Sequence, residues 1–359
     1  MKKIITIVGA RPQFIKASAV SRVIRQNYSD SLNEIIIHTG QHYDSNMSQV
    51  FFDELQIPLP KYNLSIAGGL HGAMTGRMME SIEKVLCEEK PEWVLIYGDT
   101  NSTLAGALAA AKLNIPVAHI EAGLRSFNMR MPEEVNRILA DRVSKLLFCP
   151  THAAVANLRK EGVDKGIHHV GDVMYDVALF YKELSLNKSN IMQRLQVETG
   201  QFVLATCHRA ENTDSTQRMS QILKALSKIS ERHKVLLPLH PRTRKIIHDY
   251  GLDKMLESIE ILEPLSFLDM IALEQSACAI VTDSGGVQKE AFFYGVPCIT
   301  MRDETEWTET ISSGWNTLAG ADSERIVEAI SKPFPAIRDA GAYGDGHAAV
   351  RIVDIMNGY

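Results

Sequence analysis

The chain has 359 residues, of which 45% are hydrophobic and 23% are charged, and its formal net charge is −5. The composition is ordinary for a globular protein, the length favours two domains, and the negative charge gives no general affinity for nucleic acid or an anionic membrane. No apolar stretch reaches the roughly 18 residues of a membrane helix, and the N-terminal run Ile4–Val8 is too short for a signal sequence. We therefore expect a cytoplasmic protein. The cysteines are far apart and mostly in apolar runs, which predicts reduced thiols and neither disulfides nor zinc ligands: Cys87, Cys149, Cys207, Cys278 and Cys298.

Strand-like and helix-like runs alternate along the first half of the chain, a pattern typical of parallel βαβ units. The predicted strands are Ile4–Val8, Glu34–His38, Trp93–Tyr97, Val117–Ile120 and Leu146–Cys149. A further strand-like run, Ile167–Val170, precedes the changeover between the two halves of the chain. The predicted helices are Ile15–Gln26, Ser45–Leu55, Ala73–Glu88, Thr103–Leu113 and Pro132–Val143.

The second half repeats the alternation. Its predicted strands are Phe202–Thr206, Lys234–Leu237, Ile259–Ile261, Ala279–Thr282 and Cys298–Met301. Its predicted helices are Thr216–Ser230, Pro241–Tyr250, Ser266–Gln275, Val287–Tyr294 and Ser323–Ala329. We expect an α/β fold of two Rossmann-like, doubly wound domains that face a cleft, with domains at 1–172 and 173–340 and a last helix in 341–359 that crosses back to the first domain.

A charged cluster follows the apolar run Ile115–Ile120. The segment reads HIEAGLRSFNMRMPEEVNR from His119 to Arg137, and it carries Glu121, Glu133 and Arg130. Such charges directly after a core strand are costly unless they are paired or face a cleft. Carboxylates that exchange protons beside arginines that hold phosphate suggest an enzyme with an anionic substrate, while the alternative is a surface loop of ion pairs.

Two strand-to-helix turns are candidates for binding phosphate. A Ser284-Gly285-Gly286 turn opens the helix after the strand Ala279–Thr282, and its backbone N–H groups and helix N-terminus favour an anion. Glu290, one turn further, suits ribose hydroxyls. Arg11 and Lys16 stand near the start of the first helix, where cations need an anionic partner. The alternative for the glycine turn is a structural turn without a ligand.

Further candidates follow the ends of other strands. Asp99 follows the strand Trp93–Tyr97 after a single glycine, although it could equally be a helix cap. His208 and Arg209 follow a strand of the second half, and His240 follows another. No HExxH, CxxC or aspartate cluster occurs, so we expect no required metal.

Several motifs in the correct order resemble the non-hydrolysing UDP-N-acetylglucosamine 2-epimerases, and the resemblance covers nearly the whole chain. The motifs are GARPQFIK at Gly9–Lys16, TGQH at Thr39–His42, GDTNSTLAG at Gly98–Gly106, HIEAGLR at His119–Arg125, PEEVNR at Pro132–Arg137, HRAEN at His208–Asn212 and TDSGGVQKEA at Thr282–Ala291.

The resemblance implies a glycosyltransferase-B-like enzyme, usually a homodimer, that needs no cofactor and inverts C2 of a UDP-N-acetylhexosamine. In the family's mechanism the C2 proton is removed, UDP leaves anti to give a 2-acetamidoglucal, and UDP then adds back while a proton returns to the other face. By motif, Asp99, Glu121 and Glu133 resemble the catalytic carboxylates, and His208 resembles the histidine that supports UDP departure. The UDP-binding set is Arg11, Lys16, Ser284, Gly285, Gly286 and Glu290.

The chain also departs from the family pattern. The first loop is GARPQFIK, Trp307 stands in RDETEWTE where the family has an arginine, and RSFNMRMPEE replaces a tryptophan-containing loop and adds Arg130. These changes resemble the branch that epimerises UDP-2,3-diacetamido-2,3-dideoxyglucuronic acid, whose uronate carboxylate Arg130 would pair. The family's allosteric site becomes doubtful, although Gln41, His42, Arg209 and His240 could form parts of it.

Three other functions remain open at the level of sequence. A UDP-sugar-dependent glycosyltransferase of the same architecture would need an acceptor surface and no set of carboxylates. A hydrolysing epimerase would release free N-acetylmannosamine. A non-catalytic UDP-sugar sensor is hard to reconcile with the carboxylates. Synthesis of polysaccharide or O-antigen precursors is the role that the resemblance implies.

Overall fold

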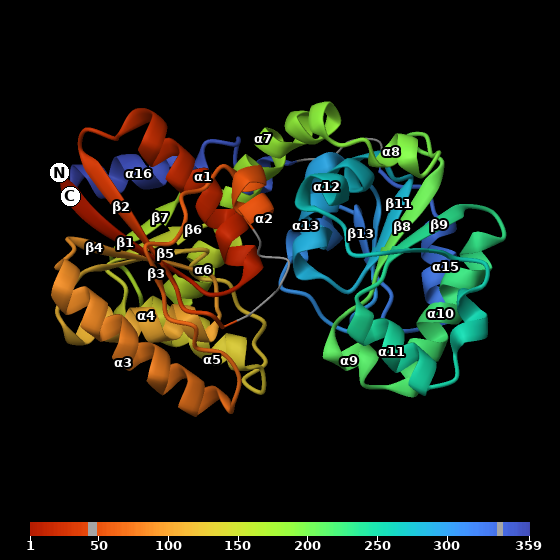
Figure 1. Ribbon diagram of the computed structural model, residues 1–359, viewed down its shortest axis with the longest axis horizontal. Helices are drawn as coiled ribbons and strands as arrows, with labels where there is room; N and C mark the ends of the chain where they lie inside the picture. Colours follow the sequence, from red (N-terminus) through yellow and green to blue (C-terminus); the bar gives the residue numbers. More distant parts are fainter. Residues whose placement is uncertain (42–48, 336–339) are drawn as a thin grey trace. The chain divides into compact units, whose positions relative to one another are not determined.

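The computed structural model describes residues 1–41, 49–335 and 340–359. The chain divides into two compact units, the first formed by Met1–Val177 with Gly341–Tyr359 and the second by Ala178–Ala340 (Figure 1). The boundary lies within α7 (Val173–Lys188), which begins in the first unit and ends in the second.

The first unit is built on a parallel sheet with the strand order β3-β2-β1-β4-β5-β6-β7. This is the doubly wound order, in which the chain starts at the middle of the sheet and moves outward in both directions. The inner strands are short apolar runs largely buried on both faces, as expected where helices cover a parallel sheet, whereas the two edge strands are more exposed. They are β1 (Lys2–Val8), β2 (Leu32–His38), β3 (Tyr62–Asn63), β4 (Trp93–Tyr97), β5 (Val117–Ile120), β6 (Leu146–Cys149) and β7 (Ile167–His169).

Helices connect these strands, and α4 shows how closely they pack on the sheet. A Cβ atom at Gly106 of α4 would lie 2.7 Å from Cδ1 of Ile7 in β1, so a larger residue would push the helix away. The helices that begin in this unit are α1 (Arg11–Asn27), α2 (Gln49–Leu55), α3 (His71–Glu89), α4 (Asn101–Lys112), α5 (Pro132–Val143), α6 (His152–Lys160), α7 and α16 (Ala348–Gly358).

The last helix, α16, packs against α1 in the first unit (Figure 1). Asp176 of α7 accepts hydrogen bonds from the backbone N–H groups of Ala348 and Ala349 at 3.1 and 2.8 Å, so it caps the start of α16. These bonds fasten the C-terminal segment to the unit that contains the N-terminus.

The second unit repeats the topology with the strand order β10-β9-β8-β11-β12-β13. Apolar clusters cover both faces of this sheet. Its strands are β8 (Phe202–Thr206), β9 (Lys234–Pro238), β10 (Glu260–Leu262), β11 (Ala279–Thr282), β12 (Cys298–Thr300) and β13 (Asn316–Leu318). Its α-helices are α8 (Ile191–Arg194), α9 (Ala210–Thr213), α10 (Thr216–Ser230), α11 (Pro241–Asp249), α12 (Phe267–Ser276), α13 (Gly285–Tyr294), α14 (Thr308–Ser312) and α15 (Ser323–Ser331), and short 3-10 turns lie at Asp253–Leu256 and Ala340–Tyr343.

The predicted fold class of two Rossmann-like, glycosyltransferase-B-like domains is confirmed by these two parallel sheets. Each predicted strand coincides with an observed strand to within a few residues. The sequence pattern did not predict β3 and β13, because edge strands of two or three residues are too short to show a periodic apolar pattern.

Candidate active site

The candidate site of the first unit lies where three neighbouring strands end. β1, β4 and β5 are adjacent and parallel, and Lys16, Asp99 and Glu121 follow their carboxyl ends. Lys16 Nζ forms an ion pair with Glu121 Oε2, and both side chains are largely buried. The structure therefore brings these predicted residues together at the edge of the sheet where doubly wound folds bind ligands.

The backbone of Glu121 is strained. Its φ is +73°, in the left-handed region that residues other than glycine rarely adopt. The neighbouring Gly98, at φ +61°, lies so close that a Cβ atom there would be 3.0 Å from Glu121 Oε2 and 3.5 Å from Lys16 Nζ. Strained residues of this kind cluster at functional sites because the surrounding structure holds them in place.

Arg137 of α5 joins two carboxylates of this edge. Its guanidinium pairs with Asp99 Oδ2 and, at 2.9 Å, with Glu134 Oε2. Removal from water raises the pKa of the Asp99 carboxyl and the charge of Glu121 adds to this rise, while Arg137 lowers it. A carboxyl that is held by an arginine and has a raised pKa is suited to exchanging a proton.

Two adjacent glutamates at the start of α5 have different surroundings. Glu134 is 1% exposed and accepts hydrogen bonds from the N–H and hydroxyl of Ser126, each at 2.9 Å, and from the N–H of Phe127 at 3.0 Å. Glu133 is exposed, and its carboxylate makes no hydrogen bond or ion pair with any residue in the described part of the chain. The catalytic role of Glu133 stays a prediction, and Glu134 has a structural role that the sequence did not indicate.

The start of α1 is fixed by Gln13, which sequence reasoning missed. Its Oε1 accepts from the N–H groups of Gly9 and Ala10 at 2.8 and 3.2 Å, and its Nε2 donates to the carbonyl of Tyr97 at 2.7 Å. Gln13 thereby links the end of β1 to the end of β4. Arg11 lies in the first turn of the same helix and is half-buried.

Arg130 lies in the segment between β5 and α5 that Glu134 holds. The residue is exposed, and its guanidinium has no hydrogen bond or ion pair with the residues that the structure describes. Its backbone N–H donates to Asn128 Oδ1 at 3.2 Å. The guanidinium is therefore available to an anion.

The candidate site of the second unit begins at the N-terminus of α13. The helix follows β11 through Ser284, whose Oγ accepts from the N–H of Val287 at 3.4 Å and so caps the helix. Gly285 and Gly286 form its first turn. Free backbone N–H groups and the helix dipole favour an anion at such a terminus.

Buried Asp283 connects this turn to the end of the neighbouring strand β8. Its carboxylate accepts from the N–H groups of His208 at 3.1 Å and Arg209 at 3.0 Å, and from Asn212 Nδ2 at 3.0 Å. The side chain of His208 is 55% exposed, with its Nδ1 3.5 Å from Asp283 Oδ1. Sequence reasoning missed Asp283, although its place directly before Ser284 at the end of a buried strand was a usable signal.

Charged and aromatic groups surround Gly285. A Cβ atom at Gly285 would lie 3.0 Å from Glu306 Oε1, 3.4 Å from Trp307 Nε1 and 3.8 Å from a nitrogen of Arg209. Lys289, 1% exposed, places its ammonium 3.9 Å from the centre of the Trp307 ring, a cation–π contact. The predicted residue Arg209 is thus brought to the start of α13.

Glu290 lies over the glycine turn. Its Oε2 is 3.9 Å from the position of a Cβ atom at Gly286. Glu274 of α12 is 1% exposed. Burial raises the pKa of the Glu274 carboxyl well above its usual range, and the charge of Glu290 adds to this rise. Both effects favour the protonated form of the Glu274 carboxyl.

The three residues predicted to take part in regulation have separate positions. Gln41 Oε1 accepts from the N–H and hydroxyl of Ser102 at 3.0 and 2.7 Å, at the start of α4. His240 is exposed and caps α11 by accepting from the N–H of Arg242 at 3.2 Å. His42 lies outside the described residues, and a regulatory role stays a prediction for all three.

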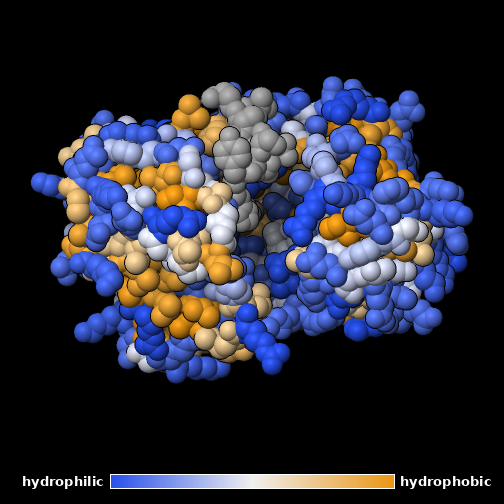
Figure 2. Space-filling model, turned by 60° about the horizontal axis from the view of Figure 1, so that its bottom comes forward, coloured by the Kyte–Doolittle hydropathy of each residue, from blue (hydrophilic) through white to orange (hydrophobic). Residues whose placement is uncertain are grey.

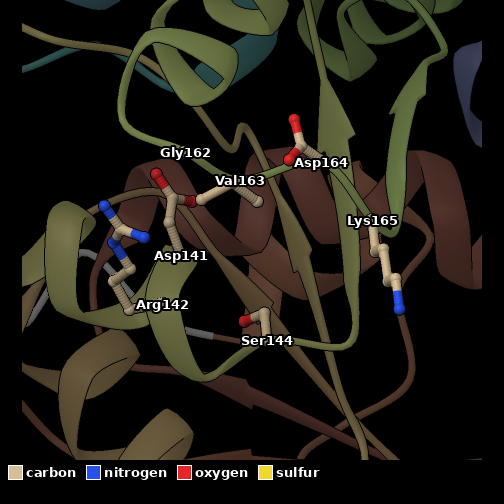
Figure 3. Close-up of a pocket in the computed structure, with 7 residues that line it drawn as sticks. All are labelled: Asp141, Arg142, Ser144, Gly162, Val163, Asp164 and Lys165. Carbon is tan, nitrogen blue, oxygen red and sulfur yellow. The ribbon is translucent and has the colours of Figure 1, made fainter.

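A separate surface hollow of about 360 Å³ lies on the first unit (Figure 3). It is lined by Asp141, Arg142, Ser144, Gly162, Val163, Asp164 and Lys165, which precede the first residues of β6 and β7. The hollow is therefore at the opposite edge of the sheet from Asp99 and Glu121. Within residues 1–41, 49–335 and 340–359, no group of three or more His, Cys, Asp or Glu side chains could hold a metal ion, and no helix is long and apolar enough to cross a membrane.

The fold and the two sets of residues define a class: a two-domain α/β enzyme with carboxylates at the strand ends of one domain and a glycine-rich helix N-terminus at a strand end of the other. Comparison with known proteins identifies the family. Residues 25–357 match the UDP-N-acetylglucosamine 2-epimerase family. The chain belongs to this family and is an isomerase, a UDP-N-acetylhexosamine 2-epimerase.

Individual relatives match over nearly their full length. The chain is 54% identical to the UDP-2,3-diacetamido-2,3-dideoxy-D-glucuronate 2-epimerase of Pseudomonas aeruginosa over 99% of both chains. It is 51% identical, over 99% of both chains, to a UDP-N-acetylglucosamine 2-epimerase homolog of Methanococcus maripaludis. The structure also matches the crystal structure of the UDP-GlcNAc 2-epimerase of Methanocaldococcus jannaschii in complex with UDP-GlcNAc and UDP. The TM-score is 0.91 over 100% of both chains, and the sequences are 42% identical.

Proposed function

We propose that the protein is a non-hydrolysing 2-epimerase whose substrate is UDP-2,3-diacetamido-2,3-dideoxyglucuronate, which it converts to the manno form. The observation that carries the proposal is the exposed Arg130 guanidinium in the segment that joins Glu121 to α5, together with the 54% identity to the Pseudomonas aeruginosa enzyme. A uronate carboxylate is the substrate group that a guanidinium pairs with best, because it accepts two parallel hydrogen bonds. UDP-N-acetylglucosamine is the competing substrate and lacks this carboxylate.

The chemistry that we propose is elimination followed by re-addition. A carboxylate removes the C2 proton, the C1–O bond to UDP breaks, and a 2-acetamidoglucal and UDP form. UDP then adds back at C1 while a second carboxyl returns a proton to the opposite face of C2. Asp99 and Glu121 suit these two proton transfers because they follow adjacent strands and each is paired to a cation.

The leaving UDP needs positive charge and hydrogen-bond donors as its diphosphate departs. The N-terminus of α13 supplies backbone N–H groups at Gly285 and Gly286, and His208 and Arg209 follow the neighbouring strand end. Glu290 supplies a carboxylate for the ribose hydroxyls. No step of this scheme calls for a redox cofactor. The same proposal includes a homodimer as the assembly and cell-surface polysaccharide synthesis as the role of the product.

The proposal is tested by incubating the enzyme in deuterium oxide with each pure nucleotide sugar and following C2 by NMR. We expect deuterium at C2 and a UDP-linked manno product, with faster turnover of the uronate. Free sugar plus UDP would identify a hydrolysing enzyme, and transfer that needs an acceptor without exchange at C2 would identify a glycosyltransferase.

A variant of Arg130 separates the two substrates. Arg130→Ala should lower kcat/KM for the uronate by about 10- to 100-fold, the usual value of a charge-assisted pair, and should leave UDP-N-acetylglucosamine within about twofold. Arg159→Ala, which removes an exposed arginine of α6, is the matched control. An equal loss on both sugars would refute the role of Arg130 in specificity.

A further inference from the structure

His119, in the middle of the first unit, has no role in the proposed chemistry although it is completely buried. It lies in β5, two residues before Glu121, and its exposure is 0%. Its Nε2 is 2.8 Å from the carbonyl oxygen of Gly98, and its Nδ1 is 2.8 Å from Asp141 Oδ1. Both ring nitrogens therefore have polar partners.

The partners determine which nitrogens carry hydrogen. A carbonyl oxygen only accepts, so Nε2 must donate to Gly98. Asp141 Oδ2 faces the Arg125 guanidinium at 2.8 Å and accepts from the N–H of Gly123 at 3.2 Å, while its Oδ1 lies against Nδ1 of the ring. The ring is therefore held by Asp141 on its Nδ1 side and donates to Gly98 on its Nε2 side.

Asp141 is itself held in place by a buried arginine. Arg125 pairs with Glu161 through two hydrogen bonds of 2.7 and 2.8 Å in addition to its pair with Asp141. A buried arginine with hydrogen-bonded carboxylate partners avoids the cost of an unpaired buried charge. These bonds orient the Asp141 carboxylate against the ring of His119.

The bond to Gly98 acts directly on the acid–base residues. Gly98 precedes Asp99, and its own N–H donates to the carbonyl of Ile120 at 3.0 Å, immediately before Glu121. β5 therefore holds Gly98 twice, through the carbonyl of Ile120 at its N–H and through the side chain of His119 at its carbonyl. A displacement of Gly98 would move Asp99 relative to Glu121, which is only 3.0 Å from the Cβ position of Gly98.

We propose that His119 is a positioning residue: its imidazole ring, oriented by Asp141 and Arg125, donates to the Gly98 carbonyl and thereby fixes Asp99 against Glu121. This inference rests on the proposed proton-transfer roles of Asp99 and Glu121. It assigns a function to the first residue of the HIEAGLR motif that is distinct from contact with the substrate.

Two matched variants test the proposal. The amide nitrogen of glutamine can occupy the place of Nε2, whereas that of asparagine reaches only the place of Nδ1. His119→Gln thus keeps the donor to Gly98, and His119→Asn keeps the donor to Asp141. Because misplacing a reacting group by about 1 Å costs on the order of 100-fold in rate, we expect kcat to fall about 100-fold in His119→Asn and about 10-fold or less in His119→Gln. KM should stay within about threefold in both, since UDP is held by the second unit.

NMR of the unaltered protein gives a readout that does not depend on a variant's folding. In protein labelled with ¹⁵N at histidine, the His119 ring should carry hydrogen at Nε2, assigned by the loss of this signal in His119→Gln. A ring without hydrogen at Nε2 would overturn the donor to Gly98. Equal losses of kcat in the two variants, or a loss of affinity instead of kcat, would overturn the positioning role. Full turnover in Asp99→Asn would instead refute the proposed function of Asp99 and leave the NMR signature of His119 unchanged.

Discussion

Replacing Arg137 by glutamine should move the acidic limb of the pH–rate profile to higher pH. Arg137 is 5% exposed and its charge lowers the pKa of Asp99, against removal from water and the charge of Glu121, which raise it. Two unit charges about 4 Å apart interact by about 4 kcal/mol at an effective dielectric of 20. The Asp99 side chain is 33% exposed, so solvent screening reduces this to about 1–2 kcal/mol, or roughly one pH unit.

The assay is kcat/KM for C2 exchange measured across the acidic range. Arg137→Gln should shift the limb upward by about one unit, whereas Arg137→Lys keeps the charge and should stay nearer to the unaltered enzyme. Arg142→Gln removes an exposed arginine of the same helix and should shift nothing. We expect Arg137→Gln to fold, because Glu134 keeps its donors from Ser126 and Phe127 when Arg137 is lost. Circular dichroism checks this. A folded Arg137→Gln protein whose limb stays in place or moves to lower pH would refute the reasoning.

Two further predictions concern stability. Burial raises the pKa of Asp176 from 3.8 to about 6, so the folded state binds the carboxyl proton more tightly than the unfolded state does. The stability that this proton contributes is present below about pH 4 and is lost as the pH rises through 6. Asp176→Asn keeps an acceptor for the N–H of Ala349. Relative to the unaltered protein, its unfolding free energy should rise by up to about 3 kcal/mol between pH 4 and 7, measured by urea unfolding. A difference between the two proteins that stays constant with pH would contradict this. Trp307→Leu removes the ring face from buried Lys289 and should cost about 2 kcal/mol or more in unfolding free energy, while Trp307→Phe should cost less; equal midpoints would contradict the cation–π assignment.

The sequence allowed much of the first unit's site to be predicted, because its residues follow strands that are apolar runs. Asp99 and Glu121 each come within two residues of such a run, and the doubly wound order places their strands side by side. The roles of Glu133 and Glu134 could not be predicted in this way. Adjacent helix residues point about 100° apart, and only the packing of α5 shows that Glu134 turns inward to Ser126 and Arg137.

Asp283 marks a second limit of the sequence, since its function depends on a pairing of distant segments. Its carboxylate accepts from the backbone of His208 and Arg209, which are about 75 residues away along the chain and adjacent only because β8 and β11 are neighbours. No local pattern encodes that contact. For the same reason the Gly98–His119 bond and the Asp176 cap of α16 become visible only in the folded structure.

Exposed apolar side chains of the first unit bear on the proposed homodimer. Hydrophobic residues gather over part of this unit on the face shown in Figure 2. The large exposed side chains include Leu70 at 83%, Phe127 at 76% and Met129 at 62%. Exposed apolar surface of this kind favours association when it is contiguous, so a sedimentation measurement on the full chain addresses that part of the proposed function.

Folding the carboxyl edge of the first sheet costs free energy, and this cost is itself an argument for function. Glu121 adopts a left-handed backbone that costs about 1–3 kcal/mol, and its side chain and that of Arg137 are buried as charges. Replacing a buried ion pair by apolar side chains of similar volume is often neutral or stabilising, so stability gives no reason to retain these pairs. The opposite edge of the same sheet is connected by polar, largely exposed turns such as 162–165. The strained Glu121 thus lies beside the buried pairs that hold it and Asp99, which is the arrangement expected when geometry is maintained for proton transfer.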